Sequence, residues 1–374
     1  MKDVGLYIHI PFCRRKCFYC DFNSYEGRES DAEVYIEALV REIEMYRKKY
    51  NLQYRTVFIG GGTPTVINYF LIGRIMEQIR PYIIQGAEVS MECNPGTVTC
   101  ESLEYYRSAG INRLSFGLQA WQDELLKKIG RIHSLEEFLS SYKAAREAGF
   151  DNISADLMFA LPGQTMEMWQ ETVKKICALG IEHISCYSLI LEEGTKLCNM
   201  HEKGIIKLPD DDLDREMYWF ATETFEEHGY GQYEISNFAR QGYQCKHNLI
   251  YWRNEEYLGV GAGSHSKLEN IRFWNHKGID EYCNVVRKGT PPVEGEEKIS
   301  PGEDMWETIF LALRLNEGLN IKEFEVKYGI DFFGIYGANV SKLQNNNLII
   351  IEDKYMRLTK RGRDLSNSVF IEFM

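Results

Sequence analysis

Short apolar stretches alternate with amphipathic ones through the first half of the chain. Apolar, β-branched runs predict strands at 5–10, 56–64, 87–95, 111–119, 152–163 and 181–190. Apolar residues three or four positions apart predict helices at 31–50, 101–110, 134–148 and 166–180. A further helical stretch is predicted after the strand at 56–64, ending at about residue 80. Asp31 is a candidate cap for the first helix, and Gly110 and Gly149 are expected to end two others.

Six strand–helix units of about 30 residues predict a parallel sheet with right-handed crossovers. Ligands of such sheets bind beyond the carboxyl ends of the strands. After residue 190 the alternation fades. We expect a helix at 210–229, irregular chain at 230–290, a linker at 289–297, and a small α+β region of winged-helix shape with a hairpin near 348–358. The predicted divisions are 1–235, 236–297 and 298–374.

The composition narrows the class of protein. A hydrophobic content of 44% over 374 residues predicts a packed core, and a net charge of −12 argues against nucleic-acid binding. No apolar run is long enough to span a membrane. The N-terminal segment has no small-residue cleavage site, so no signal peptide is expected. Seven cysteines are scattered singly, which is typical of reduced thiols and predicts a cytoplasmic location.

The remaining three cysteines form one cluster. Cys13, Cys17 and Cys20 lie in "IHIPFCRRKCFYCDF", directly after the first predicted strand. The C-x3-C-x2-C spacing differs from the paired C-x2-C groups of zinc sites and suits three ligands of a [4Fe-4S] cluster with one iron left free. Three unrelated thiols, or a zinc ion with a distant fourth ligand, are the alternatives.

These residues closely resemble the radical S-adenosylmethionine (SAM) enzymes, in particular the group of oxygen-independent coproporphyrinogen dehydrogenase (HemN) and the HemW-type haem chaperones. The motifs "GGGTPT", "MECNP", "SFGLQ", "GRIH" and "SADLMFALPGQ" extend the resemblance. It implies a partial (β/α)6 barrel of the α/β class, a [4Fe-4S] cluster, and SAM bound at the open iron. The SAM contacts that it implies are Tyr7, Tyr19, Gly61, Gly62, Thr63, Glu92, Gln119, Arg131 and Asp156.

Two features indicate which member of the group the chain resembles. The dehydrogenase continues its cysteine motif with a further cysteine and carries a long arm before it; this chain has Phe22 and only six residues before Tyr7. Both departures are similar to the HemW pattern. "HNLIYW", 247–252, resembles the haem motif H-N-x-x-Y-W of those chaperones, which implies His247 as a haem ligand. His265 and Cys245 are further candidates, and a buried histidine among packed aromatics is the alternative.

The favoured function is therefore a haem chaperone that binds haem, a [4Fe-4S] cluster and SAM and delivers haem to respiratory haem proteins. The alternative is a radical SAM enzyme acting on a tetrapyrrole; a third reading is a scaffold that binds SAM without turnover. The resemblance implies a reductant such as flavodoxin or ferredoxin. Catalysis, a homodimer and peripheral membrane contact are left open.

Overall fold

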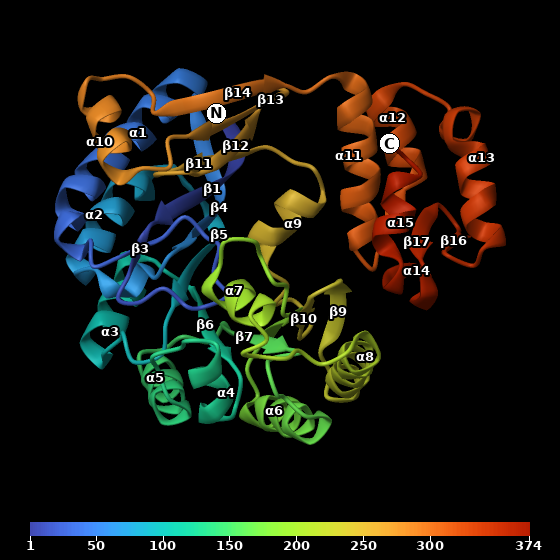
Figure 1. Cartoon of the computed structure of the whole chain (residues 1–374). Coiled ribbons are helices and arrows are strands. Elements are labelled where there is room, and N and C mark those ends of the chain that lie inside the picture. The colour runs from blue at the N-terminus through green and yellow to red at the C-terminus, as the bar shows by residue number, and fades with distance from the viewer.

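A curved sheet forms the centre of the computed structural model, which describes all 374 residues (Figure 1). Six of its strands are parallel and adjacent in chain order, as predicted. These strands are β1 (Lys2–Ile10), β4 (Leu52–Gly61), β5 (Ile83–Cys93), β6 (Arg113–Gln119), β7 (Ile153–Phe159) and β8 (His183–Ser188). Their carboxyl ends therefore meet at one rim, where the motifs were expected to gather.

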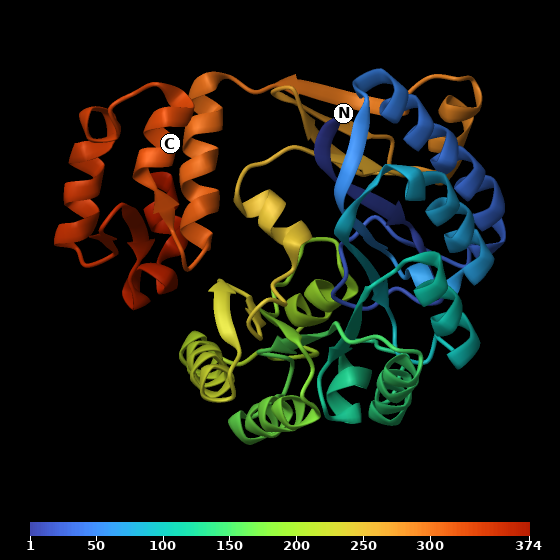
Figure 2. The ribbon, with the colours of Figure 1, turned by 180° about the vertical axis from the view of Figure 1, so that it is seen from behind.

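Helices cover the convex side of the curved sheet (Figures 1 and 2). They are amphipathic, and each buries its apolar stripe against the strands. The main ones are α1 (Ala32–Tyr50), α2 (Tyr69–Ile79), α3 (Cys100–Ala109), α5 (Leu135–Glu147), α6 (Met166–Leu179) and α8 (Asp211–Glu227). None of the helices is both long enough and apolar enough to cross a membrane.

Local capping agrees only partly with the sequence prediction. Gly110 adopts a left-handed conformation directly after α3, as expected of a helix stop. Asp31 stands at the start of α1, but its side chain makes no capping hydrogen bond and instead pairs with Arg28. Several short elements were not predicted: η1 (Glu29–Asp31), η2 (Pro64–Val66), η3 (Arg80–Tyr82), α4 (Asp123–Lys128) and α7 (Lys196–Glu202).

The segment after residue 230 extends the sheet at both edges. The expected irregular chain at 230–290 and linker at 289–297 are wrong: β9 (Gly231–Glu234) and β10 (Asn237–Ala239) pair beyond β8. At the other edge β11 (Tyr257–Val260) runs parallel to β1, followed by β12 (His265–Leu268), β13 (Ile271–Asn275) and β14 (Val293–Lys298). These short strands gain their order from partners distant in sequence, which local composition does not reveal.

Two helices belong to the same segment, α9 (Lys246–Trp252) and α10 (Ile279–Arg287). Helix α9 lies at the open side of the curved sheet, between the sheet and the C-terminal region (Figures 1 and 2). It packs against β4 and α11. The Glu88 carboxylate on β5 accepts the backbone N–H groups of Lys246 and His247, both at 3.1 Å, which fixes the N-terminus of α9.

The C-terminal region has its own hydrophobic core, spanning Ile309 to Phe373 and separate from the main one. It is an α+β unit with a three-stranded sheet, β15-β17-β16, and the expected hairpin. The division of the chain at residues 235 and 297 stays a prediction. The elements are α11 (Pro301–Arg314), β15 (Leu319–Asn320), α12 (Ile321–Tyr328), α13 (Phe332–Asn345), β16 (Ile349–Glu352), β17 (Tyr355–Leu358), α14 (Lys360–Asp364) and α15 (Ser366–Ile371).

Candidate functional site

The cysteine loop leaves the rim directly after β1 and is closed by a short strand pair. Strand β2 (Phe12–Cys13) pairs with β3 (Tyr25–Glu26), and the Tyr25 N–H donates to the Pro11 carbonyl at 2.7 Å. Within the loop the Cys20 N–H donates to the Cys17 carbonyl at 3.2 Å. These bonds hold three cysteines of one short segment on a single, closed loop.

The glycine turn after β4 lies against the base of this loop. The Gly62 N–H donates to the Ile10 carbonyl at 2.9 Å, and the Thr63 N–H donates to the Phe12 carbonyl at 2.8 Å. A Cβ atom at Gly62 would lie 2.7 Å from the Phe12 oxygen, so only glycine permits this approach. The Thr63 hydroxyl in turn lies 3.7 Å from the Cys13 sulfur. The turn therefore positions the first cysteine.

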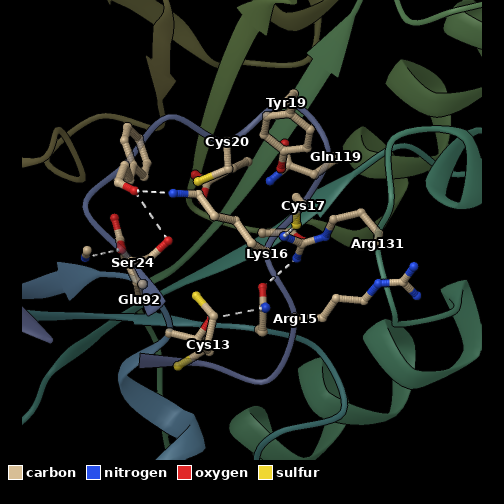
Figure 3. A pocket seen from close by; sticks show the side chains of 18 of the residues that line it. Cys13, Arg15, Lys16, Cys17, Tyr19, Cys20, Ser24, Glu92, Gln119 and Arg131 are labelled. Carbon is tan, nitrogen blue, oxygen red and sulfur yellow. Dashed lines mark hydrogen bonds between the residues drawn. The ribbon is translucent and has the colours of Figure 1, made fainter. Parts of the chain in front are cut away.

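The three cysteines line one cavity of about 130 Å³, shown in Figure 3. All thirteen residues proposed from sequence line this cavity or the deeper one that adjoins it; His247 and Tyr7 line only the deeper one. The proposed residues that line the cysteine cavity are Cys13, Cys17, Tyr19, Cys20, Gly61, Gly62, Thr63, Glu92, Gln119, Arg131 and Asp156.

The donor set of this cavity fits an iron–sulfur cluster. Three thiols from one loop face it, and Arg15 and Lys16 of the same loop line it, so positive charge is available to offset thiolates and sulfides. Burial raises the pKa of the Cys13 and Cys20 thiols.

Arg131 connects the cysteine loop to the strand ends. Its guanidinium donates to the Gly117 carbonyl at 2.6 Å and to the Asn94 side chain, and it lies 3.5 Å from the Cys17 sulfur. His133 contacts the Arg131 Nε at 3.2 Å, and burial together with the Arg131 charge lowers the pKa of His133 to about 3. A neutral His133 therefore supports the arginine without repelling it.

Two carboxyl groups, Glu92 and Asp156, lie at the rim between the two cavities. The Glu92 carboxylate accepts the Gly61 N–H at 3.0 Å, and Asp156 accepts the Ser115 hydroxyl at 3.1 Å. Burial, followed by the charge of Asp156, raises the pKa of Glu92 to about 7; burial also raises the pKa of Asp156. Such acceptors suit the hydroxyl or ammonium groups of a polar ligand.

The deeper cavity, of about 430 Å³, continues from this rim into the inside of the curved sheet. The two cavities adjoin, because they share Tyr19, Phe22, Glu92, Ser115, Gln119 and Asp156. Its far end is formed by side chains from β1, β4, β6 and α9 and by Cys245, directly before α9. Those from the four elements are Tyr7, Phe58, Arg113, His247, Asn248 and Tyr251.

His247 lines this deeper cavity but is committed to two hydrogen bonds. Only 1% of the residue is exposed; Nδ1 lies 2.8 Å from the Thr56 hydroxyl and Nε2 lies 2.9 Å from the Tyr251 hydroxyl. Burial, followed by the charges of Arg113 and Arg55, lowers the pKa of His247 to about 3. The ring is therefore neutral, which is the form that binds iron, but Nε2 must first give up Tyr251.

The two other candidate haem ligands, Cys245 and His265, lie in different places. Cys245 lines the deeper cavity, and its thiol lies 3.5 Å from the Glu88 carboxylate. His265 is exposed on β12, stacks on Trp274 with ring centroids 5.9 Å apart, and lines neither cavity. The structure thus brings Cys245 into the site and leaves His265 outside it.

Sequence reasoning missed several residues of the deeper cavity. Arg113 begins a buried strand, and a charged residue in that position is the signal that could have marked it. Tyr187 lies near the end of β8 and is 40% exposed; Ile190, after that strand, is 68% exposed, and Phe22 is 60% exposed. Nothing in the local sequence shows that these three apolar side chains border one cavity.

Known proteins match the chain over its full length. The model of the radical SAM superfamily matches residues 7–176, and that of the HemN C-terminal domain matches residues 299–365. The "Heme chaperone HemW" of Bacillus subtilis is 39% identical, covering 98% of both chains, and that of Lactococcus lactis is 36% identical, covering 100% of this chain and 98% of the relative. The solved structure of coproporphyrinogen III oxidase (HemN) from Escherichia coli shares the fold, with a TM-score of 0.86 at 24% identity over 99% of this chain and 89% of that one.

Proposed function

The chain belongs to the HemW family within the radical SAM superfamily, and from this premise we propose that it is a haem chaperone. It binds haem and passes it to haem proteins. The observation that carries the proposal is the lining of the deeper cavity: the H-N-x-x-Y-W residues His247, Asn248 and Tyr251 line it, and it adjoins the cysteine cavity.

Members of this superfamily use a [4Fe-4S] cluster and SAM. We assign the cluster to Cys13, Cys17 and Cys20, which line one cavity. The bound cluster supplies a one-electron reduction of the sulfonium ligand. Arg131 carries the positive charge that suits the SAM carboxylate, and Glu92 and Asp156 offer acceptors for its ammonium and ribose hydroxyls.

The glycine turn and the aromatic residues complete this assignment. Gly61 and Gly62 let the backbone approach a ligand closely, and Thr63 steadies Cys13. Tyr19 and Gln119 line both cavities and close the space between the cluster loop and the barrel interior. We assign Tyr7, whose hydroxyl lies 2.9 Å from His9 Nδ1, to the inner wall of the SAM site.

His247 is the proposed haem ligand. Its neutral imidazole lines the cavity, and Nε2 becomes available when the Tyr251 hydroxyl moves away. The aromatic faces of Tyr251 and Phe58 provide apolar area for a flat porphyrin. Haem recipients among respiratory proteins, and a flavodoxin or ferredoxin as reductant, complete the proposal; the ten free cysteines support a cytoplasmic location.

A radical SAM enzyme that acts on a tetrapyrrole is the second candidate. One observation favours it: Glu92, Gln119 and Asp156 line both cavities, so a ligand inside the barrel would adjoin the SAM site. A chaperone has no evident need for that continuity.

The test reconstitutes the cluster anaerobically, adds SAM and a one-electron reductant such as dithionite, and supplies haem and coproporphyrinogen III separately. The chaperone proposal expects haem binding, seen as a shift of the haem absorbance, and its loss in His247→Ala with the iron–sulfur absorbance unchanged. His265→Ala is the matched control, because that histidine is exposed and lies outside both cavities. Decarboxylation of coproporphyrinogen with release of methionine would instead establish the enzyme and refute the chaperone.

A further inference from the structure

A buried arginine without a partner lies at the inner end of the deeper cavity. Arg113, the first residue of β6, is 2% exposed, and its Nε has no hydrogen-bond partner. The side chain lines the cavity together with His247 and Tyr251. A guanidinium stays charged at any physiological pH, and a buried charge is costly unless it is paired.

The neighbouring acidic groups are engaged elsewhere. The Glu88 carboxylate accepts two backbone N–H groups at the start of α9, both at 3.1 Å, and the Cys245 thiol at 3.5 Å. Asp156 accepts the Ser115 hydroxyl at 3.1 Å. These carboxyl groups supply a negative field around Arg113 but no ion pair with it, so the guanidinium is left free to bind an anionic group inside the cavity.

The opposite end of the cavity is apolar and open to solvent. Phe22, Tyr187 and Ile190 line it and are 60%, 40% and 68% exposed. A ligand that fits both ends has a broad apolar body at the mouth and a carboxylate that reaches inward. Haem has this form, since its ring is flat and apolar and its propionates are carboxylates.

We propose that Arg113 binds a propionate carboxylate of haem inside the barrel, while the ring rests against the apolar mouth. This inference rests on the proposed haem-binding function and assigns to Arg113 the binding of the haem propionate. The arrangement resembles other buried arginine–carboxylate pairs, in which two parallel N–H bonds fix the orientation of the ligand.

The experiment compares haem with haem dimethyl ester, in which both propionates are neutral, on the full-length protein with its cluster reconstituted. The wild type should bind haem about tenfold to a hundredfold more tightly than the ester. Arg113→Gln should bind the two equally, whereas Arg113→Lys, which keeps the charge, should retain part of the preference. A preference for haem over the ester in Arg113→Lys would show that substitution at this position does not by itself unfold the protein.

Two further variants test whether an arginine other than Arg113 accounts for the preference for haem over the ester. Arg55→Gln removes an arginine of β4 that pairs with Glu255 and lines neither cavity, so its preference for haem should match the wild type. Arg314→Gln alters a third cavity, between the barrel and the C-terminal region, where the Arg314 guanidinium lies 4.6 Å from the centre of the Trp252 ring. If Arg314→Gln lost the preference for haem over the ester while Arg113→Gln kept it, the inference would be overturned.

The outcomes separate the inference from the function on which it rests. Equal binding of haem and ester by the wild type refutes the role of Arg113 and leaves the chaperone proposal standing. Failure of the wild type to bind either compound refutes the chaperone proposal and the inference together.

Discussion

Replacement of Tyr251 by phenylalanine should tighten haem binding and destabilise the haem-free protein. The Tyr251 hydroxyl lies 2.9 Å from Nε2 of His247, and the Thr56 hydroxyl lies 2.8 Å from Nδ1. Under the proposal that His247 binds haem iron through Nε2, the iron must displace the tyrosine hydroxyl. Phenylalanine keeps the ring, which meets the imidazole edge-on with centroids 5.1 Å apart, and removes only the competing hydroxyl.

The size of the effect follows from the burial of His247. With 1% of the residue exposed, water cannot replace the lost hydroxyl, so Nε2 is left unpaired at a cost of about 1–3 kcal/mol. Haem iron restores a partner to that nitrogen and recovers this energy. We therefore expect haem affinity to rise by roughly fivefold to a hundredfold, and the free energy of unfolding of the haem-free protein to fall by a similar amount.

Haem titration followed by visible absorbance gives the affinity, and urea unfolding of the haem-free protein gives the stability. Tyr257→Phe is the matched control, because Tyr257 packs edge-on against Tyr251 and makes no contact with the His247 nitrogens. A Tyr251→Phe protein that loses stability but binds haem no more tightly than the wild type would show that Nε2 of His247 is not the iron ligand.

Three further changes test the framework of the site. Cys17→Ala should abolish the visible iron–sulfur absorbance and the bound iron after reconstitution, whereas Cys100→Ala, an exposed cysteine outside the loop, should leave both unchanged. Gly62→Ala places a Cβ 2.7 Å from a backbone carbonyl and should lower the free energy of unfolding by about 1–3 kcal/mol in urea, whereas Gly302→Ala meets open space and should not. Burial raises the pKa of Glu42 to about 7, so this carboxyl is protonated more readily in the folded than in the unfolded chain. Stability should therefore fall as pH rises from about 4.5 to about 7 and then level off, with a loss of about 3 kcal/mol that is absent from Glu42→Gln.

Local sequence predicted the features that depend on neighbouring residues. The six parallel strands and their helices follow from apolar spacing, which each element carries within itself. The cysteine loop and the glycine turn were also predicted, because their residues are adjacent in sequence and lie at the ends of recognisable strands. Strands β11 to β14 were missed, since β11 is ordered by pairing with β1 about 250 residues earlier.

The barrel, the cysteine loop and the resemblance that indicates haem could all be predicted from the amino-acid sequence. The surroundings of each group come from the fold: Thr56 and Tyr251 contact both nitrogens of His247, Arg113 Nε has no hydrogen-bond partner, and His265 lines neither cavity. The physical reason is that hydrogen bonding and burial depend on which distant segments pack together, and a linear pattern of residues does not record that packing.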